Sequence, residues 1–140
     1  MRKMGLFVVS AFLLGVLATH YSNASNHGDP AQDTPRVKLE NLLKAELEGV
    51  DGTEVIVSRV TIPPNTSLPK HWHPGEEFAY IVEGSCVLWQ DGKEDTPGTA
   101  GDAMMVPLKQ VHTAMTGDEG ATLIVFRVHE QGQPERILVD

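Results

Sequence analysis

The amino-acid sequence predicts an all-β domain, either a sandwich or a barrel, and three observations lead to this prediction. Short runs rich in Val, Ile, Leu and aromatic residues follow one another closely after Gly49. Turn-forming groups of Pro, Gly, Asn and Asp separate these runs, and the spacing typical of amphipathic helices is nearly absent there. Many short strands joined by tight turns are typical of closed or two-layered β architectures.

The elements follow from this alternation of apolar runs and turns. Asp91-Gly92 is the pair best suited to a two-residue hairpin. Residues 37–47 have leucines at helical spacing and fit either a short helix or an irregular edge element. Turns are expected at residues 63–65, 74–75, 83–84, 91–92, 97–98 and 117–120. Strands are expected at residues 54–62, 78–82, 85–90, 103–106, 111–115, 121–128 and 136–139.

The N-terminus reads as a secretory signal peptide covering residues 1–24. A basic start, Arg2-Lys3, precedes an apolar run over residues 4–18 and a small-x-small site at residues 22–24. The alternative is an uncleaved anchor, but a span needs about 20 apolar residues and this run ends earlier. We therefore expect an exported protein, periplasmic or secreted, with no stable membrane anchor. Residues 25–46 are expected to be a flexible tail followed by the helix or edge element, and residues 47–140 the β-barrel domain.

Charge limits the partners of the mature chain. The sequence has 11 Lys+Arg and 19 Asp+Glu, and residues 1–24 contain only Arg2 and Lys3 among them, which leaves 9 − 19 = −10. The acidic residues are scattered, as on an ordinary solvated surface. Without clustered Lys and Arg, nucleic acid and anionic membranes are not expected partners. The lone Cys86 cannot form an internal disulfide and lies in an apolar run, so we expect a buried core residue.

Four histidines fall within the domain, and two of them alternate along the chain. On an extended strand His71 and His73 point to the same face, about 7 Å apart along the backbone. Two imidazoles on one face suit a transition metal ion. Glu77 follows after the Pro74-Gly75 pair, and His112 comes from a remote strand.

Residues 65–84 resemble the first motif of the cupin superfamily, G-x5-H-x-H-x3–4-E-x6-G. His71, His73, Glu77 and Gly84 occupy its positions, and Asn65 replaces its first glycine. Asn tolerates positive φ, so the turn is expected to survive this change. The second motif, G-x5-P-x-G-x2-H-x3-N, is matched by Gly101, Pro107 and His112, with Lys109 and Thr116 in place of its later glycine and asparagine.

This resemblance implies a small single-domain cupin jelly-roll barrel, also called a double-stranded β-helix. It implies one divalent transition metal ion (Fe, Mn, Ni, Cu or Zn) held by His71, His73, Glu77 and His112, with Glu76 as the competing carboxylate. Such a ligand set leaves coordination positions open for water or substrate. By analogy with the family we also expect a homodimer.

Two functions are compatible with these residues. The first is a metal-dependent enzyme acting on a small molecule, dioxygenase-like or with related lyase or isomerase chemistry. The alternative is a non-catalytic cupin that binds a small ligand or only the metal. Candidate pocket walls, each of which also fits an ordinary core position, are Trp89, Met104, Met105 and Phe126; His129 is expected at the surface.

Overall fold

A computed structural model describes residues 36–139 of the chain. The predicted signal peptide (residues 1–24) and most of the predicted tail lie outside the described residues, so cleavage and export stay predictions. Over residues 36–139 no helix of the length and hydropathy needed to span a membrane is found.

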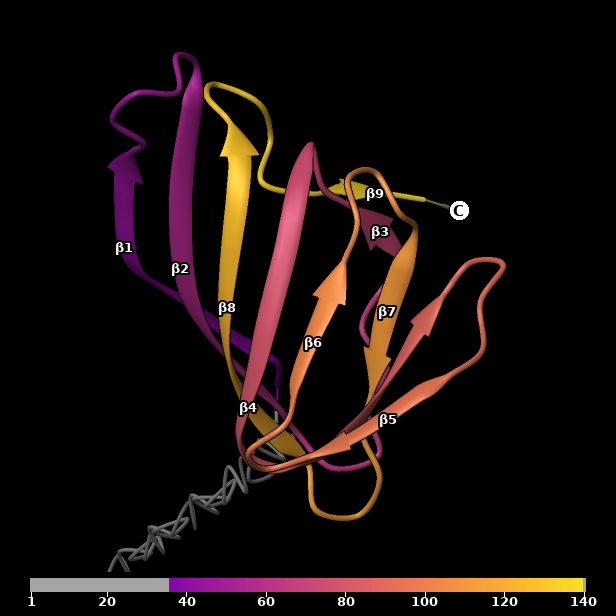
Figure 1. The fold of residues 1–140 in the computed structure, drawn as a ribbon. Coiled ribbons are helices and arrows are strands. Elements are labelled where there is room, and N and C mark those ends of the chain that lie inside the picture. Colours follow the sequence, from indigo (N-terminus) through magenta and orange to yellow (C-terminus); the bar gives the residue numbers. More distant parts are fainter. Residues whose placement is uncertain (1–35, 140) are drawn as a thin grey trace, which may run out of the picture. The chain divides into compact units, whose positions relative to one another are not determined.

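The described chain consists of nine β-strands and their connections (Figure 1). This confirms the all-β fold class predicted from the short apolar runs. In chain order the strands are β1 (Lys38–Glu46), β2 (Thr53–Ile62), β3 (His71–Trp72), β4 (Gly75–Gln90), β5 (Thr96–Thr99), β6 (Ala103–Val106), β7 (His112–Met115), β8 (Ala121–Glu130) and β9 (Ile137–Leu138).

The strands form one strongly curled antiparallel sheet, in the order β1-β2-β8-β4-β7-β3-β9 (Figure 1). β5 and β6 pair with β4 off this path. The first half of β4 pairs with β6 and β8, whereas its second half pairs with β5 and β7. β4 therefore belongs to both walls of the curled sheet and joins them.

The predicted turn at Glu83-Gly84 is wrong, because β4 runs through it as one strand of 16 residues. The register against β8 shifts between Ile81 and Glu83, and Gly84 has a φ of +75°. A bulge with a left-handed glycine bends a strand sharply without ending it. The sequence feature read as a turn is therefore the corner at which β4 passes from one wall to the other.

Two further segments, residues 38–46 and the predicted turn at residues 97–98, are both strands in the structure. Residues 38–46 form the edge strand β1, antiparallel to β2, so of the two alternatives the edge element is right and the helix wrong. Pro97 and Gly98 lie within β5, which pairs with Ser85–Leu88 of β4, so the predicted turn there is a short strand. The hairpin between β4 and β5 consequently has a loop longer than Asp91-Gly92 alone.

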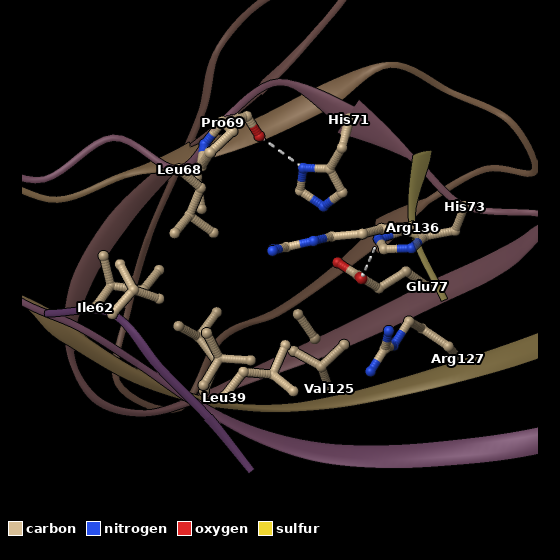
Figure 2. A pocket seen from close by; sticks show the side chains of 15 residues that line it. Leu39, Ile62, Leu68, Pro69, His71, His73, Glu77, Val125, Arg127 and Arg136 are labelled. Carbon is tan, nitrogen blue, oxygen red and sulfur yellow. Dashed lines mark hydrogen bonds and ion pairs between the residues drawn. The ribbon is translucent and has the colours of Figure 1, made fainter. Parts of the chain in front are cut away.

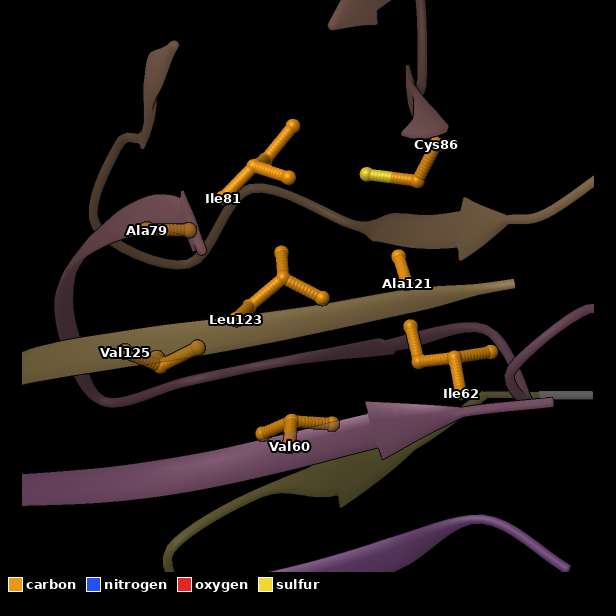
Figure 3. Packing of buried hydrophobic residues seen from close by; sticks show 8 residues of the cluster. All are labelled: Val60, Ile62, Ala79, Ile81, Cys86, Ala121, Leu123 and Val125. Carbon is orange, nitrogen blue, oxygen red and sulfur yellow. The ribbon is translucent and has the colours of Figure 1, made fainter. Parts of the chain in front are cut away.

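The core fills one end of the curled sheet, and its side chains come from the inward-facing positions of β2, β4 and β8 (Figure 3). Cys86 is 4% exposed, and burial raises the pKa of its thiol, which confirms the prediction of a core residue. The buried cluster consists of Val60, Ile62, Ala79, Ile81, Cys86, Ala121, Leu123 and Val125.

Two residues that replace motif glycines keep the backbone conformation a glycine would adopt. Asn65 has a φ of +50° and Lys109 a φ of +59°. Asn65 is among the few residue types that adopt this region readily, as the sequence led us to expect. At Lys109 the amide donates a hydrogen bond to the carbonyl of His73, 3.2 Å away, which ties this turn to the histidine segment.

Candidate metal centre

Three histidines meet inside the curled sheet, at the end opposite the apolar core. His71 lies in β3 and is the register partner of His112 in β7, while His73 directly follows β3. They are 6%, 3% and 4% exposed, respectively. One nitrogen from each ring lies within 4.8 Å of the others, which is a spacing that can hold a metal ion.

A backbone carbonyl orients each of these rings. Nδ1 of His71 lies 2.8 Å from the Pro69 carbonyl, and Nδ1 of His112 lies 2.9 Å from that of Gln110. Nδ1 of His73 pairs with the carbonyl of Glu135. A carbonyl only accepts hydrogen bonds, so each Nδ1 carries the proton and each Nε2 presents its lone pair, as in metal-ligating histidines.

Glu77 is the carboxylate that faces these nitrogens. Its Oε2 lies 2.9 Å from Nε2 of His73, and its Oε1 lies 3.7 Å from Nε2 of His112. Two atoms bound to one metal ion at about 2.1 Å and at right angles are about 3 Å apart, close to the shorter distance. Glu76 points to the other face of β4, because successive side chains of a strand alternate.

Burial sets the protonation of the free site. It lowers the pKa of His71 to about 4 and also lowers that of His112. Burial alone would raise the pKa of Glu77, but the nearby imidazoles of His73 and His112 and the guanidinium group of Arg127 outweigh it, so this pKa is lowered. Around neutral pH the site therefore offers neutral imidazoles at His71 and His112 beside an ionised carboxylate.

We expect the metal-free protein to lose stability as the pH falls from about 7 to about 4. The His71 pKa is about 4 in the folded state against 6.5 in the unfolded chain, so the unfolded state binds more protons in this window. This favours unfolding by up to roughly 3 kcal/mol. The lowered pKa of Glu77 acts in the same direction. Urea unfolding at both pH values measures the effect.

The control for this pH dependence is His71→Gln, which has no group that titrates in this range. Its stability is expected to fall less over the same pH interval than that of the unaltered chain. Equal losses in the two proteins would show that His71 is not the source.

A cavity of about 230 Å³ adjoins His71 and His73 (Figure 2). Glu77, Arg127 and Arg136 are its charged side chains. Its remaining wall is apolar and comes mainly from β1, β2 and β8 together with the segment before β3. The lining residues other than those named are Val37, Leu39, Val60, Ile62, Leu68, Pro69, His71, His73, Ala79, Ala114, Leu123 and Val125.

The pocket walls suggested by the sequence do not line this cavity. Met105 and Phe126 are 49% and 44% exposed, on the outer face of the sheet. Met104 packs against the buried core, and Trp89 stacks under the ammonium group of Lys70, 4.0 Å from its ring centre. The sequence shows that successive side chains of a strand alternate between two faces. It does not show which of these faces points into the cavity.

The sequence led us to expect His129 at the surface, and this expectation is wrong. The residue is 1% exposed. Its Nδ1 lies 3.3 Å from Oε1 of Glu54, and its Nε2 lies 3.1 Å from the Pro134 carbonyl. Arg127, two residues earlier on the same face of β8, was missed altogether. A single arginine within an apolar strand run was the available clue, since an inward charge in such a run needs a partner.

Comparison of the sequence with known protein families gives one match. Residues 58–127 match the family model described as "Cupin domain". No curated protein sequence matches the chain significantly.

Several solved structures share the fold at low sequence identity. A cupin-like protein from Thermotoga maritima is 20% identical, with a TM-score of 0.60 over 76% of this chain and 77% of that one. KdgF from Halomonas sp. is 16% identical, with a TM-score of 0.55 over 70% and 85%. DMSP lyase DddQ from Ruegeria pomeroyi DSS-3 is 22% identical, with a TM-score of 0.63 over 74% of this chain. The match spans only 52% of the lyase chain.

Proposed function

Because the chain belongs to the cupin family, we propose that it binds one divalent transition metal ion and acts on a small molecule in the adjoining cavity. The proposed ligands are Nε2 of His71, His73 and His112 together with the carboxylate of Glu77. Imidazole and carboxylate groups accept Fe, Mn, Ni, Cu or Zn, and the ligand set does not select among them.

One observation carries this proposal. Nε2 of His73 faces Oε2 of Glu77 at 2.9 Å, although Nδ1 of His73 carries the ring proton that bonds to the Glu135 carbonyl. With Glu77 ionised, two lone pairs point at each other, and this Nε2 has no hydrogen-bond partner in the described part of the chain. A cation between these atoms turns the repulsion into two favourable contacts.

The donor set also supports a reactive rather than a purely structural site. When bound, the ion supplies Lewis acidity to an oxygen of the small molecule. An ion held by four protein ligands would keep coordination positions open to a small molecule, and His71, His73 and Glu77 line the largely apolar cavity in which that molecule would lie. The backbone carbonyls that hold the three Nδ1 protons fix the ring directions.

We propose lyase and dioxygenase reactions as the first classes to test. A lyase is included because one structural relative bears that name, and a dioxygenase because the three-histidine, one-carboxylate ligand set resembles that of cupin dioxygenases. The alternative is a cupin that binds its ligand without transforming it. Homodimer formation and export to the periplasm or medium belong to the same proposal and await size measurement and N-terminal sequencing of the mature protein.

The test begins with metal analysis of the purified protein, followed by reloading with each candidate ion. Oxygen uptake and product formation are then followed over small carboxylates, phenols, diketones and thiols. Turnover that depends on one ion and is lost in His71→Ala supports the enzyme. A metal-loaded protein that binds a panel member without turnover supports the binding alternative, and a protein that takes up no ion contradicts both.

A further inference from the structure

Arginine side chains are concentrated at one cavity of an otherwise acidic protein. The whole chain has a formal charge of −8, yet the described residues of the cavity wall include two arginines, Arg127 and Arg136, and one carboxylate, Glu77. Glu135, outside the wall, pairs with Arg127. These four side chains sum to +2 − 2 = 0, and a divalent ion raises the sum to +2.

Arg127 is a buried cation, 2% exposed, held rigidly in the wall. It donates hydrogen bonds from Nη2 to the Ser58 hydroxyl, 2.6 Å away, and from Nη1 to Oε2 of Glu135, 3.2 Å away. Nη1 also lies 3.5 Å from the Glu135 carbonyl. A guanidinium has five N–H donors, and Nε has no partner in the described residues. The group is fixed in place and retains donor capacity.

Arg136 is the second cation and has no hydrogen bond or ion pair within residues 36–139. Its side chain extends into the pocket below the His71 ring in Figure 2, with Arg127 directed into the same space. This places a planar donor group, paired with none of the described residues, beside the proposed metal ligands. A guanidinium group can bind a carboxylate through two parallel hydrogen bonds.

The opposite part of the cavity is apolar and small. Ile62, Leu68, Leu123 and Val125 line it, with Leu39 of β1 at the rim. A volume of about 230 Å³ corresponds to roughly eight water molecules at about 30 Å³ each. A ligand that fills this space has a polar head and a hydrocarbon tail of only a few carbons.

We propose that the cavity binds a small aliphatic carboxylate. Its carboxylate group lies between the Arg136 and Arg127 guanidinium groups, and its hydrocarbon tail lies against Ile62, Leu123 and Val125. This assigns a ligand class to the site proposed above and rests on that function only for the added charge of the metal ion. Both arginine side chains belong to the wall of the cavity itself, whether or not an ion is bound.

The experiment compares 4-methylpentanoate with its neutral isostere 4-methylpentanamide by calorimetric titration of the zinc-loaded and the metal-free protein. We expect the acid to bind the zinc-loaded protein at least about 10-fold more tightly than the amide, because hydrogen bonds to a charged group are the stronger ones. Acetate, which lacks the tail, is expected to bind more weakly than 4-methylpentanoate. A separate zinc titration reports on the metal site itself.

Arg136→Gln is expected to weaken acid binding by roughly 10-fold and to leave amide and zinc binding within about twofold. Arg127→Lys keeps the buried charge but removes the planar guanidinium group, and it is also expected to weaken binding of the acid. Arg59→Gln is the matched control, since Arg59 is exposed and pairs with Glu40 at 2.9 Å on the outer face.

Equal affinity for acid and amide, or an unchanged preference in Arg136→Gln, overturns the carboxylate assignment. If zinc nevertheless binds, the metal proposal stands without it. If zinc does not bind but the metal-free protein prefers the acid through Arg136, the metal proposal fails and the carboxylate site remains.

Discussion

Replacing His112 with alanine is expected to lower the affinity of the protein for Zn²⁺ by more than about 100-fold. Loss of a group that only supports a ligand costs 10–100-fold in known metal sites, and His112 is proposed as a ligand itself. His71→Ala is expected to have a similar effect, because the two residues are register partners on adjacent strands and face the same point. Competition with a chromophoric chelator measures both affinities.

Glutamate variants distinguish the two carboxylates that follow His73. Glu77→Gln keeps the shape of the side chain but removes its charge, and we expect a loss of zinc affinity of roughly 10-fold or more. Glu76→Gln makes the same chemical change one residue away, on the other face of β4, and is expected to leave zinc affinity within about twofold. Circular dichroism checks that both variants fold.

A large loss of zinc affinity in Glu76→Gln with none in Glu77→Gln would show that Glu76, and not Glu77, is the carboxylate ligand. Loss in neither variant would leave three histidines as the whole donor set. The second result would make the charge of the ligand set less negative by one and would strengthen the expected attraction for anions in the cavity.

The candidate ligands could be named from the sequence because most of them are local. His71, His73 and Glu77 lie within seven residues, and strand alternation alone places both histidines on one face. His112 came only from the motif resemblance. What could not be read was the orientation of His73, because the carbonyl that holds its Nδ1 belongs to Glu135, 62 residues further along the chain.

The cavity was less predictable than the metal site for a physical reason. Alternation in β8 puts Val125 and Arg127 on one face and Phe126 on the other, but local sequence favours the aromatic residue for the interior. The curl of the sheet decides the matter, since the inner wall is lined by small aliphatic side chains while the larger Phe126 and Met105 lie outside. In the sequence, the bulge near Gly84, at which β4 passes from one wall to the other, looked like an ordinary turn.

Gly75→Ala is expected to destabilise the protein by more than about 4 kcal/mol, enough to unfold most domains of this size. A Cβ at this position would lie 2.0 Å from the carbonyl oxygen of Val128 and 2.8 Å from Cα of His129. Both atoms are backbone of β8, so no side-chain rotation relieves the clash. Urea unfolding followed by circular dichroism measures the loss.

Gly117→Ala is the matched control for this substitution. A Cβ there meets no atom within 4 Å, and no positive φ stands against it. Its stability is expected to equal or exceed that of the unaltered chain by up to about 1 kcal/mol, since alanine restricts the unfolded chain. Similar losses in Gly75→Ala and Gly117→Ala would mean that the close approach of β4 to β8 is not what requires glycine.

The position of Gly75 links this close approach to the candidate metal site. Gly75 lies between His73 and Glu77 in the chain. Its close contact with β8 therefore helps to fix the backbone positions from which these two side chains extend. Zinc at about 1,000 times its dissociation constant stabilises a native state by about 4 kcal/mol, comparable with the expected loss. Zinc is therefore expected to restore folded Gly75→Ala protein only if the clash leaves the ligand geometry intact, and adding His112→Ala to that variant should abolish the rescue.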